Sequence, residues 1–266
     1  MQAAILGVLA SVCYLGAAAQ TAREILAGPP ARYLTSCLAW LGLALHGAYL
    51  TLIFLRLGDL NFGFFNAAAL VTWVIVLILQ CAAVDKPVEK LGAAVFPLAA
   101  LALAMDIGFP ARPHVLSMHN WQMNLHVLSS IIAFSLLNLA ALQAMLLIMQ
   151  DKQLRGHKPR RLALALPPLQ AMETLLFQLI GVGLLFLSGS LVSGFLFIDD
   201  LFAQHLVHKT VLSITAWLIF GGLLLGRWRY GWRGAAAIRW TLLGFAALAL
   251  AYFGSKLVLE LILKRV

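Results

Sequence analysis

The sequence predicts an all-α fold: a polytopic membrane helical bundle of about eight transmembrane helices. Hydrophobic residues make up 62% of the 266-residue chain and charged residues only 11%, whereas soluble domains carry about 25% charged residues. The mean hydropathy is +0.93. The apolar residues also fall into runs of about 20 residues, the length that a spanning helix needs, with the charges gathered in short loops between them. No loop resembles a linker, so we expect a single membrane domain over residues 1–266.

Each apolar run is interpreted in order as one span. The first lacks a positively charged leader region and an evident cleavage site, which favours a retained span. The fourth is short and contains Pro97, which favours a kink. The fifth is longer than a bilayer requires, and the sixth follows the pair Pro167 and Pro168. The predicted spans are 2–19, 34–55, 64–84, 91–105, 121–150, 175–198, 206–226 and 240–263.

The distribution of Lys and Arg predicts the orientation of the spans. The first, third, fifth and seventh loops hold thirteen of the 19 basic residues, and the other side holds six. Because basic loops stay in the cytoplasm, both termini are expected on the periplasmic side of a bacterial inner membrane. This orientation explains the net charge of +9 without a nucleic-acid partner.

Several classes of chemistry lack their usual motifs. Cys13, Cys37 and Cys81 are isolated within apolar segments, which argues against a thiol redox centre or a zinc site. No nucleotide-binding loop, hydrolase triad or pair of catalytic carboxylates occurs, so we expect no enzymatic activity.

Histidines gather on the side predicted to face the periplasm. His46 is predicted about 14 Å below the outer end of the second span, His126 opens the fifth span, and His208 shares a face with His205 where the seventh begins. His114 and His119 belong to the outer loop before Trp121, and only His157 belongs to a cytoplasmic loop. Imidazole is a common ligand of haem iron, and facing helices can build such a site. Trp121 is predicted to line one side of a site for a flat cofactor.

A simpler interpretation stays open for each histidine, because a single intramembrane imidazole can merely hydrogen-bond a neighbouring helix. Three other features also have a structural interpretation. Glu173 suits a helix N-terminus electrostatically, and Asn66 favours an interhelical hydrogen bond or a cofactor contact. The basic aromatic segment 227–234 is explained by anchoring or by docking of a partner. Two small-residue pairs, Gly189 with Ser193 and Ser190 with Gly194, predict close helix packing.

The residues together resemble a known family. The resemblance rests on His126, on the segment 173–177, on the segment from His208 through Trp217 to Gly234, and on the segment 252–255. These features are similar to the cytochrome c assembly protein family, and most of all to its small eight-span inner-membrane branch of YpjD/HemX-like proteins. The haem-presenting members carry a W-x-W-D core in an outer loop, which this chain lacks.

The resemblance implies a relationship to proteins that handle haem at the outer membrane face and hold it with histidines. We therefore expect a haem-binding accessory protein of cytochrome c assembly, with non-covalent b-type haem and a cytochrome c maturation component or another membrane protein as partner. His126 and His208 would ligate the iron, and His46 would be a supporting group or an alternative ligand. The alternative is a cofactor-free membrane regulator or partner subunit. A transporter is weaker, since no inverted repeat is apparent.

Overall fold

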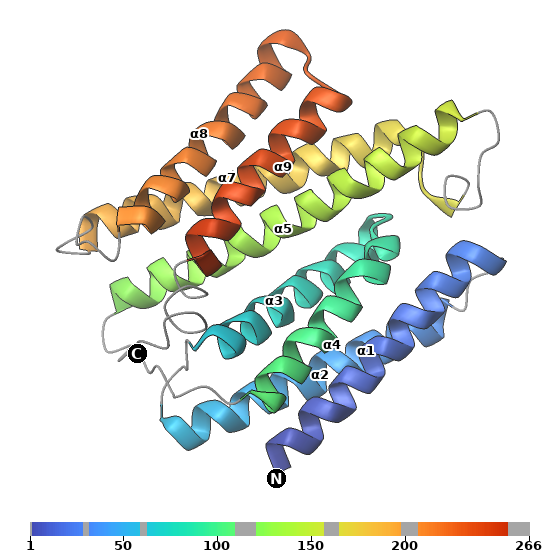
Figure 1. Cartoon of the computed structure of the whole chain (residues 1–266), viewed down its shortest axis with the longest axis vertical. Coiled ribbons are helices and arrows are strands. Elements are labelled where there is room, and N and C mark those ends of the chain that lie inside the picture. The colour runs from blue at the N-terminus through green and yellow to red at the C-terminus, as the bar shows by residue number, and fades with distance from the viewer. Residues whose placement is uncertain are drawn as a thin grey trace. The chain divides into compact units, whose positions relative to one another are not determined.

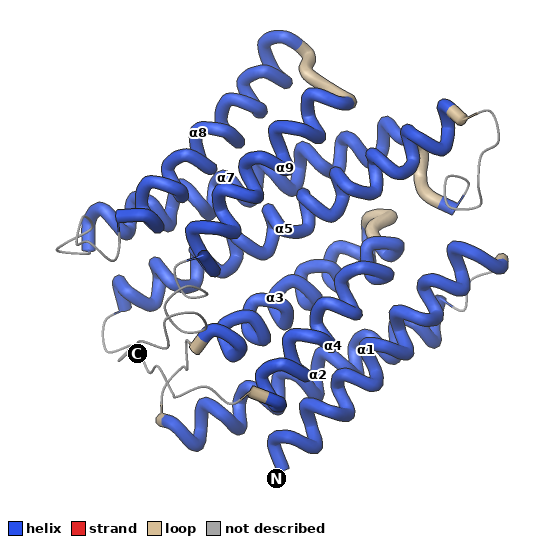
Figure 2. Tube along the Cα trace, in the orientation of Figure 1, coloured by secondary structure: helices blue, strands red, loops and turns tan. Residues whose placement is uncertain are grey.

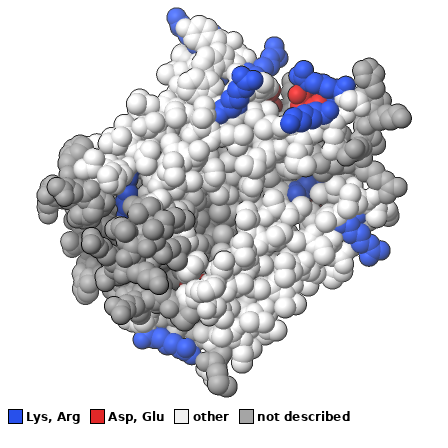
Figure 3. Space-filling view, viewed as in Figure 1, with Lys and Arg blue, Asp and Glu red and all other residues white. Residues whose placement is uncertain are grey.

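The computed structural model describes residues 2–28, 32–58, 63–109, 121–156, 165–197 and 207–254. These residues form helices without a strand (Figure 2), which confirms the predicted all-α class. Eight of the helices are long and apolar enough to cross a membrane, as predicted. On the face shown in Figure 3, most atoms belong to uncharged residues.

The described residues fall into two compact units. The first contains α1 (Gln2–Ala27), α2 (Arg32–Leu57), α3 (Phe64–Asp85), the short η1 (Glu89–Leu91) and α4 (Gly92–Gly108). Consecutive long helices contact one another and α4 returns to α1, so the four close into a ring (Figure 1). The helix α4 continues through Pro97.

The second unit contains α5 (Trp121–Arg155), α7 (Leu169–Phe197), α8 (Val207–Tyr230), α9 (Ala235–Ala249) and the π-helical turn η2 (Leu250–Gly254). Its long helices also close into a ring, in which α5 packs along α7 and also touches α9 (Figure 1). Several spans are longer than the apolar runs alone predict: α7 begins before Glu173 and α9 before Trp240. The last part of the predicted eighth span lies outside the described residues.

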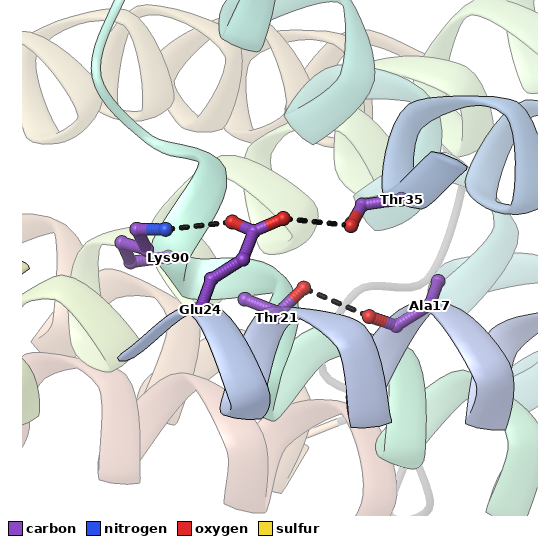
Figure 4. A network of polar contacts seen from close by, with 5 residues as sticks. All are labelled: Ala17, Thr21, Glu24, Thr35 and Lys90. Carbon is purple, nitrogen blue, oxygen red and sulfur yellow. Dashed lines mark hydrogen bonds and ion pairs between the residues drawn. The ribbon is translucent and has the colours of Figure 1, made fainter. Parts of the chain in front are cut away.

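A partly buried ion pair and its hydrogen-bond partner join three elements of the first unit. The Lys90 ammonium lies 2.8 Å from Oε2 of Glu24, and the side chains are only 18% and 6% exposed. The Thr35 hydroxyl donates to the other carboxylate oxygen at 2.9 Å. Figure 4 shows the carboxylate held between these two donors, with Thr21 nearby bonding back to the Ala17 carbonyl. The network therefore ties the end of α1 to the beginning of α2 and to η1.

A second carboxylate organises the turn between α8 and α9, which we call the basic aromatic turn (residues 227–240). Glu173 of α7 accepts a hydrogen bond from the backbone N–H of Gly234, the N-cap residue of α9. Its other oxygen lies 4.0 Å from Nη1 of Arg227, which donates to the Trp232 carbonyl. Glu173 thus complements the positive N-terminus of α9. The sequence had instead suggested that Glu173 complements the N-terminus of its own helix, α7.

Glycine is required at the beginning of this turn because Trp232 lies directly on Gly226. A Cβ atom added to Gly226 would overlap the indole ring, whereas one added to Gly222 would meet nothing within 4 Å. The Trp232 ring stacks on Trp240 with centroids 5.9 Å apart.

Replacing Lys90 with Met should destabilise the first unit, because it leaves the largely buried Glu24 carboxylate without its cationic partner. We expect a cost of about 2 to 3 kcal/mol, seen as a lower melting temperature of the purified protein in detergent. The double variant Glu24→Gln/Lys90→Met should recover part of the loss. The exposed pair Asp151–Arg155 is the control: Asp151→Asn should cost less than about 0.5 kcal/mol. Equal losses for both pairs would contradict the structural role of Lys90.

The substitution Gly226→Ala should displace Trp232 and lower the free energy of unfolding by about 1 to 3 kcal/mol through overpacking. Gly222→Ala on the same helix should be neutral or slightly stabilising, because alanine favours the helix where there is space for its methyl group. Tryptophan fluorescence and thermal unfolding measure both variants. Identical behaviour of the two would mean that Trp232 is not packed on Gly226.

Candidate functional site

The geometry around His126 is the most specific feature among the predicted site residues. His126 lies within the first turns of α5, and its Nδ1 atom is 2.9 Å from the backbone carbonyl oxygen of Ser190 in α7. The same nitrogen is 3.2 Å from the Ser193 hydroxyl oxygen. The Ser193 hydroxyl itself donates to the Ser190 carbonyl at 2.9 Å. Ser190 and Ser193 are buried on one face of α7.

These contacts determine which ring nitrogen carries the proton. A carbonyl oxygen only accepts hydrogen bonds, so Nδ1 of His126 must be the donor. In a neutral imidazole this leaves the lone pair on Nε2. Histidines that ligate metals typically donate their other N–H to a carbonyl or carboxylate, which orients the ring. In this tautomer, Nε2 is the ring atom that carries the lone pair a metal would need.

Small polar residues let α5 and α7 approach closely at this point. The Ser129 and Ser130 hydroxyls donate to the His126 carbonyl at 3.0 and 2.7 Å, and Ser130 also shares a hydrogen bond with the Ser190 hydroxyl. Ser190 is buried with Gly194, as expected for a small-residue pair. Gly189, by contrast, is exposed, and a Cβ atom added to it would meet nothing within 4 Å. Of the other predicted pair, therefore, Ser193 is buried and Gly189 is not.

Trp121 and His208 lie at the same end of the second unit as His126. Trp121 is the first residue of α5, 66% exposed, and packs edge to face on Phe197 at the end of α7 with centroids 6.0 Å apart. His208 is exposed in the first turn of α8. The antiparallel alignment of α7 and α8 is set by a 2.8 Å hydrogen bond from the Trp217 indole to the Ser188 hydroxyl. The beginning of α8 therefore lies beside the end of α7 (Figure 1).

His46 belongs to the first unit and is completely buried. Its Nδ1 atom is 3.3 Å from the Tyr14 hydroxyl of α1, and the Tyr14 ring stacks on Phe96 of α4. Its Nε2 atom has no hydrogen-bond partner among the described residues. The remaining histidines, His114, His119, His157 and His205, lie outside the described residues, and no group of three metal-ligating side chains occurs within the described part.

The sequence did not single out a second polar cluster in the first unit. The carboxylate of Asp106, near the end of α4, accepts hydrogen bonds on Oδ2 from the Tyr49 hydroxyl at 2.7 Å and from the Asn66 amide at 3.0 Å. Tyr49 and Asn66 are buried. The interhelical bond predicted for Asn66 is confirmed. Asp106 escaped notice because the predicted fourth span ended one residue before it.

Fold and site together define a multi-pass membrane protein, entirely helical where it is described, with a hydrogen-bonded imidazole near one end of its second unit. The chain belongs to the cytochrome c assembly protein family, which it matches over residues 34–263. Its eight apolar helices and its similarity to a protein named as an inner membrane protein indicate a multi-pass protein of the inner membrane.

Two curated relatives illustrate the similarity. The inner membrane protein YpjD of Escherichia coli is 36% identical over 142 residues, which cover 53% of each chain. An uncharacterised 28.8 kDa protein of Azospirillum brasilense is 33% identical over 142 residues, which cover 53% of this chain and 52% of that protein. The chain thus spans about half the length of the curated relatives that it matches. A search of solved structures found no significant match.

Replacing Tyr49 with Phe should loosen the first unit, because the Asp106 carboxylate loses its shorter hydrogen bond in a place with little access to water. The expected cost is about 1 to 2 kcal/mol, measured as a lower melting temperature in detergent. Tyr33→Phe is the matched control, since Tyr33 is 91% exposed on the same helix. An unchanged melting temperature for Tyr49→Phe would show that this bond contributes nothing to stability.

Proposed function

We propose that this protein is a haem-binding accessory protein of cytochrome c assembly, and that His126 ligates the haem iron through Nε2. The observation that carries the proposal is the hydrogen bond from Nδ1 of His126 to the Ser190 carbonyl. This bond orients the ring and leaves the lone pair on Nε2, and an iron ligand needs both. Membership of the cytochrome c assembly family supports the choice of haem over another cofactor.

His208 is the second residue that would hold the haem iron. It lies at the same end of the second unit as His126 and is exposed, so its ring can reach a cofactor without disturbing packed side chains. Trp121 and Phe197 offer aromatic surface at this end for the flat porphyrin. When bound, haem would supply the iron porphyrin that cytochrome c assembly requires. The protein's own part is to hold and orient it at the predicted periplasmic end.

His46 is a weaker candidate in this proposal. Its ring is fully buried by side chains of its own unit, so a porphyrin could reach Nε2 only after displacing them. We propose for it a supporting role within the first unit, through the Tyr14 hydroxyl.

The test is the absorption spectrum of protein purified after expression with abundant haem. We expect a Soret band that is lost, or reduced more than tenfold in haem content, in His126→Ala. The variant His126→Gln is more informative, because an amide can still donate to the Ser190 carbonyl but is a poor iron ligand. It should keep the melting temperature and lose the haem. His208→Ala should weaken binding and shift the band, since one of the two proposed iron ligands is removed.

His157→Ala is the control, because it removes an imidazole from the loop predicted to face the cytoplasm. It should leave the spectrum unchanged. A wild-type protein without a Soret band, or a band that survives in both His126 variants, would overturn the proposal. That result would favour the alternative of a cofactor-free membrane partner subunit.

A further inference from the structure

The basic aromatic turn carries positive charge that its own structure does not neutralise. Arg227 is the arginine of this turn that has partners among the described residues: it faces Glu173, donates to the Trp232 carbonyl and lies 4.7 Å above the Phe177 ring. Arg229, Arg233 and Arg239 are exposed, and within the described part of the chain none of the three forms an ion pair. The segment 227–240 contains no Asp or Glu.

Aromatic side chains lie between these arginines and are exposed on the same turn. Trp228 is 81% exposed and Tyr230 is 75% exposed. Trp232 stacks between Tyr230 and Trp240, with ring centroids 6.5 Å and 5.9 Å away. Large exposed rings beside arginines are typical of the zone where lipid headgroups meet acyl chains, because each ring has an apolar body and a polar edge.

The turn is also fixed in shape before any partner arrives. Gly231 and Gly234 have φ of +67° and +59°, a conformation that glycine adopts without strain. The Glu173 carboxylate holds the N–H of Gly234, and Arg227 holds the carbonyl of Trp232. A preformed arrangement of charges binds a ligand with a smaller loss of conformational entropy than a flexible loop would.

Both helices that the turn joins are long and apolar enough to span the membrane. The turn therefore lies at the membrane surface, where the molecules beside it are phospholipids. Arginine is well suited to phosphate, because its planar guanidinium donates two parallel hydrogen bonds to phosphate oxygens.

We propose that the basic aromatic turn binds the headgroup phosphate of an anionic phospholipid. Arg229 and Arg233 contact the phosphate, and Trp228 and Tyr230 lie against the glycerol and upper acyl region. A lipid fits better than a protein partner, because the exposed rings and arginines alternate along one short turn that lies at the membrane surface. The proposal is independent of haem binding, since it involves no residue of the His126 site.

The experiment measures lipid preference on the full-length protein in nanodiscs that contain equal amounts of phosphatidylglycerol and phosphatidylcholine. After extraction in mild detergent, native mass spectrometry counts the lipids of each kind that stay bound. The wild type should retain phosphatidylglycerol in preference to phosphatidylcholine. Arg229→Gln/Arg233→Gln should reduce that preference about fivefold for each arginine removed.

Lys152→Gln/Arg155→Gln is the matched control, because it removes the same charge from exposed residues at the end of α5, a segment predicted to face the same membrane surface. It should keep the preference. Arg229→Lys/Arg233→Lys keeps the charge without the planar fork and should give an intermediate value.

Two outcomes would overturn the proposal. The first is equal retention of both lipids by the wild type, and the second is an equal loss in the control pair, which would mean that net charge alone attracts the lipid. Melting temperatures of all variants identify any that fail to fold. If Arg229→Gln/Arg233→Gln fails to fold, the lipid preference is measured on the single variant Arg229→Gln instead.

Discussion

Polar side chains inside the spans need hydrogen-bond partners from the protein itself, from their own helix or from a neighbouring one, because the bilayer core offers no water. The described helices satisfy this constraint at a few points. His126 and Ser130 of α5 meet Ser190 and Ser193 of α7. In the first unit, Tyr49, Asn66 and Asp106 join α2, α3 and α4. Each cluster determines where two or three helices must meet, while the apolar residues between the clusters only require burial.

The same constraint links structure to the proposed function. An imidazole could satisfy its hydrogen-bonding needs in several ways, but donation from Nδ1 to a backbone carbonyl leaves one nitrogen with a lone pair. The residues that make this possible are small, since serines at 190 and 193 allow the α7 backbone to come within hydrogen-bond distance of the His126 ring. Packing and chemistry at this point therefore depend on the same residues.

Much of the fold could be predicted from the sequence, because long apolar runs have few alternatives in a membrane. The number of spans, the helical class and the family were all predicted correctly. The ends of spans were predicted less well: Asp106 and Glu173 lie inside helices that the apolar pattern ended too early or began too late. A span predicted from hydropathy ends at the first charged residue. The helix itself continues where a neighbouring element can form a hydrogen bond with that residue.

The sequence by itself determined which residue types enter the membrane, since hydrophobic length and histidine position are local properties. It pointed to His126 and to Ser190 as residues of interest for separate reasons. Only the tertiary structure decided that these two residues are partners and that Glu173 belongs to the start of α9. The physical reason is that a hydrogen bond requires two groups within about 3 Å of each other, and the helices that bring them together are far apart along the chain.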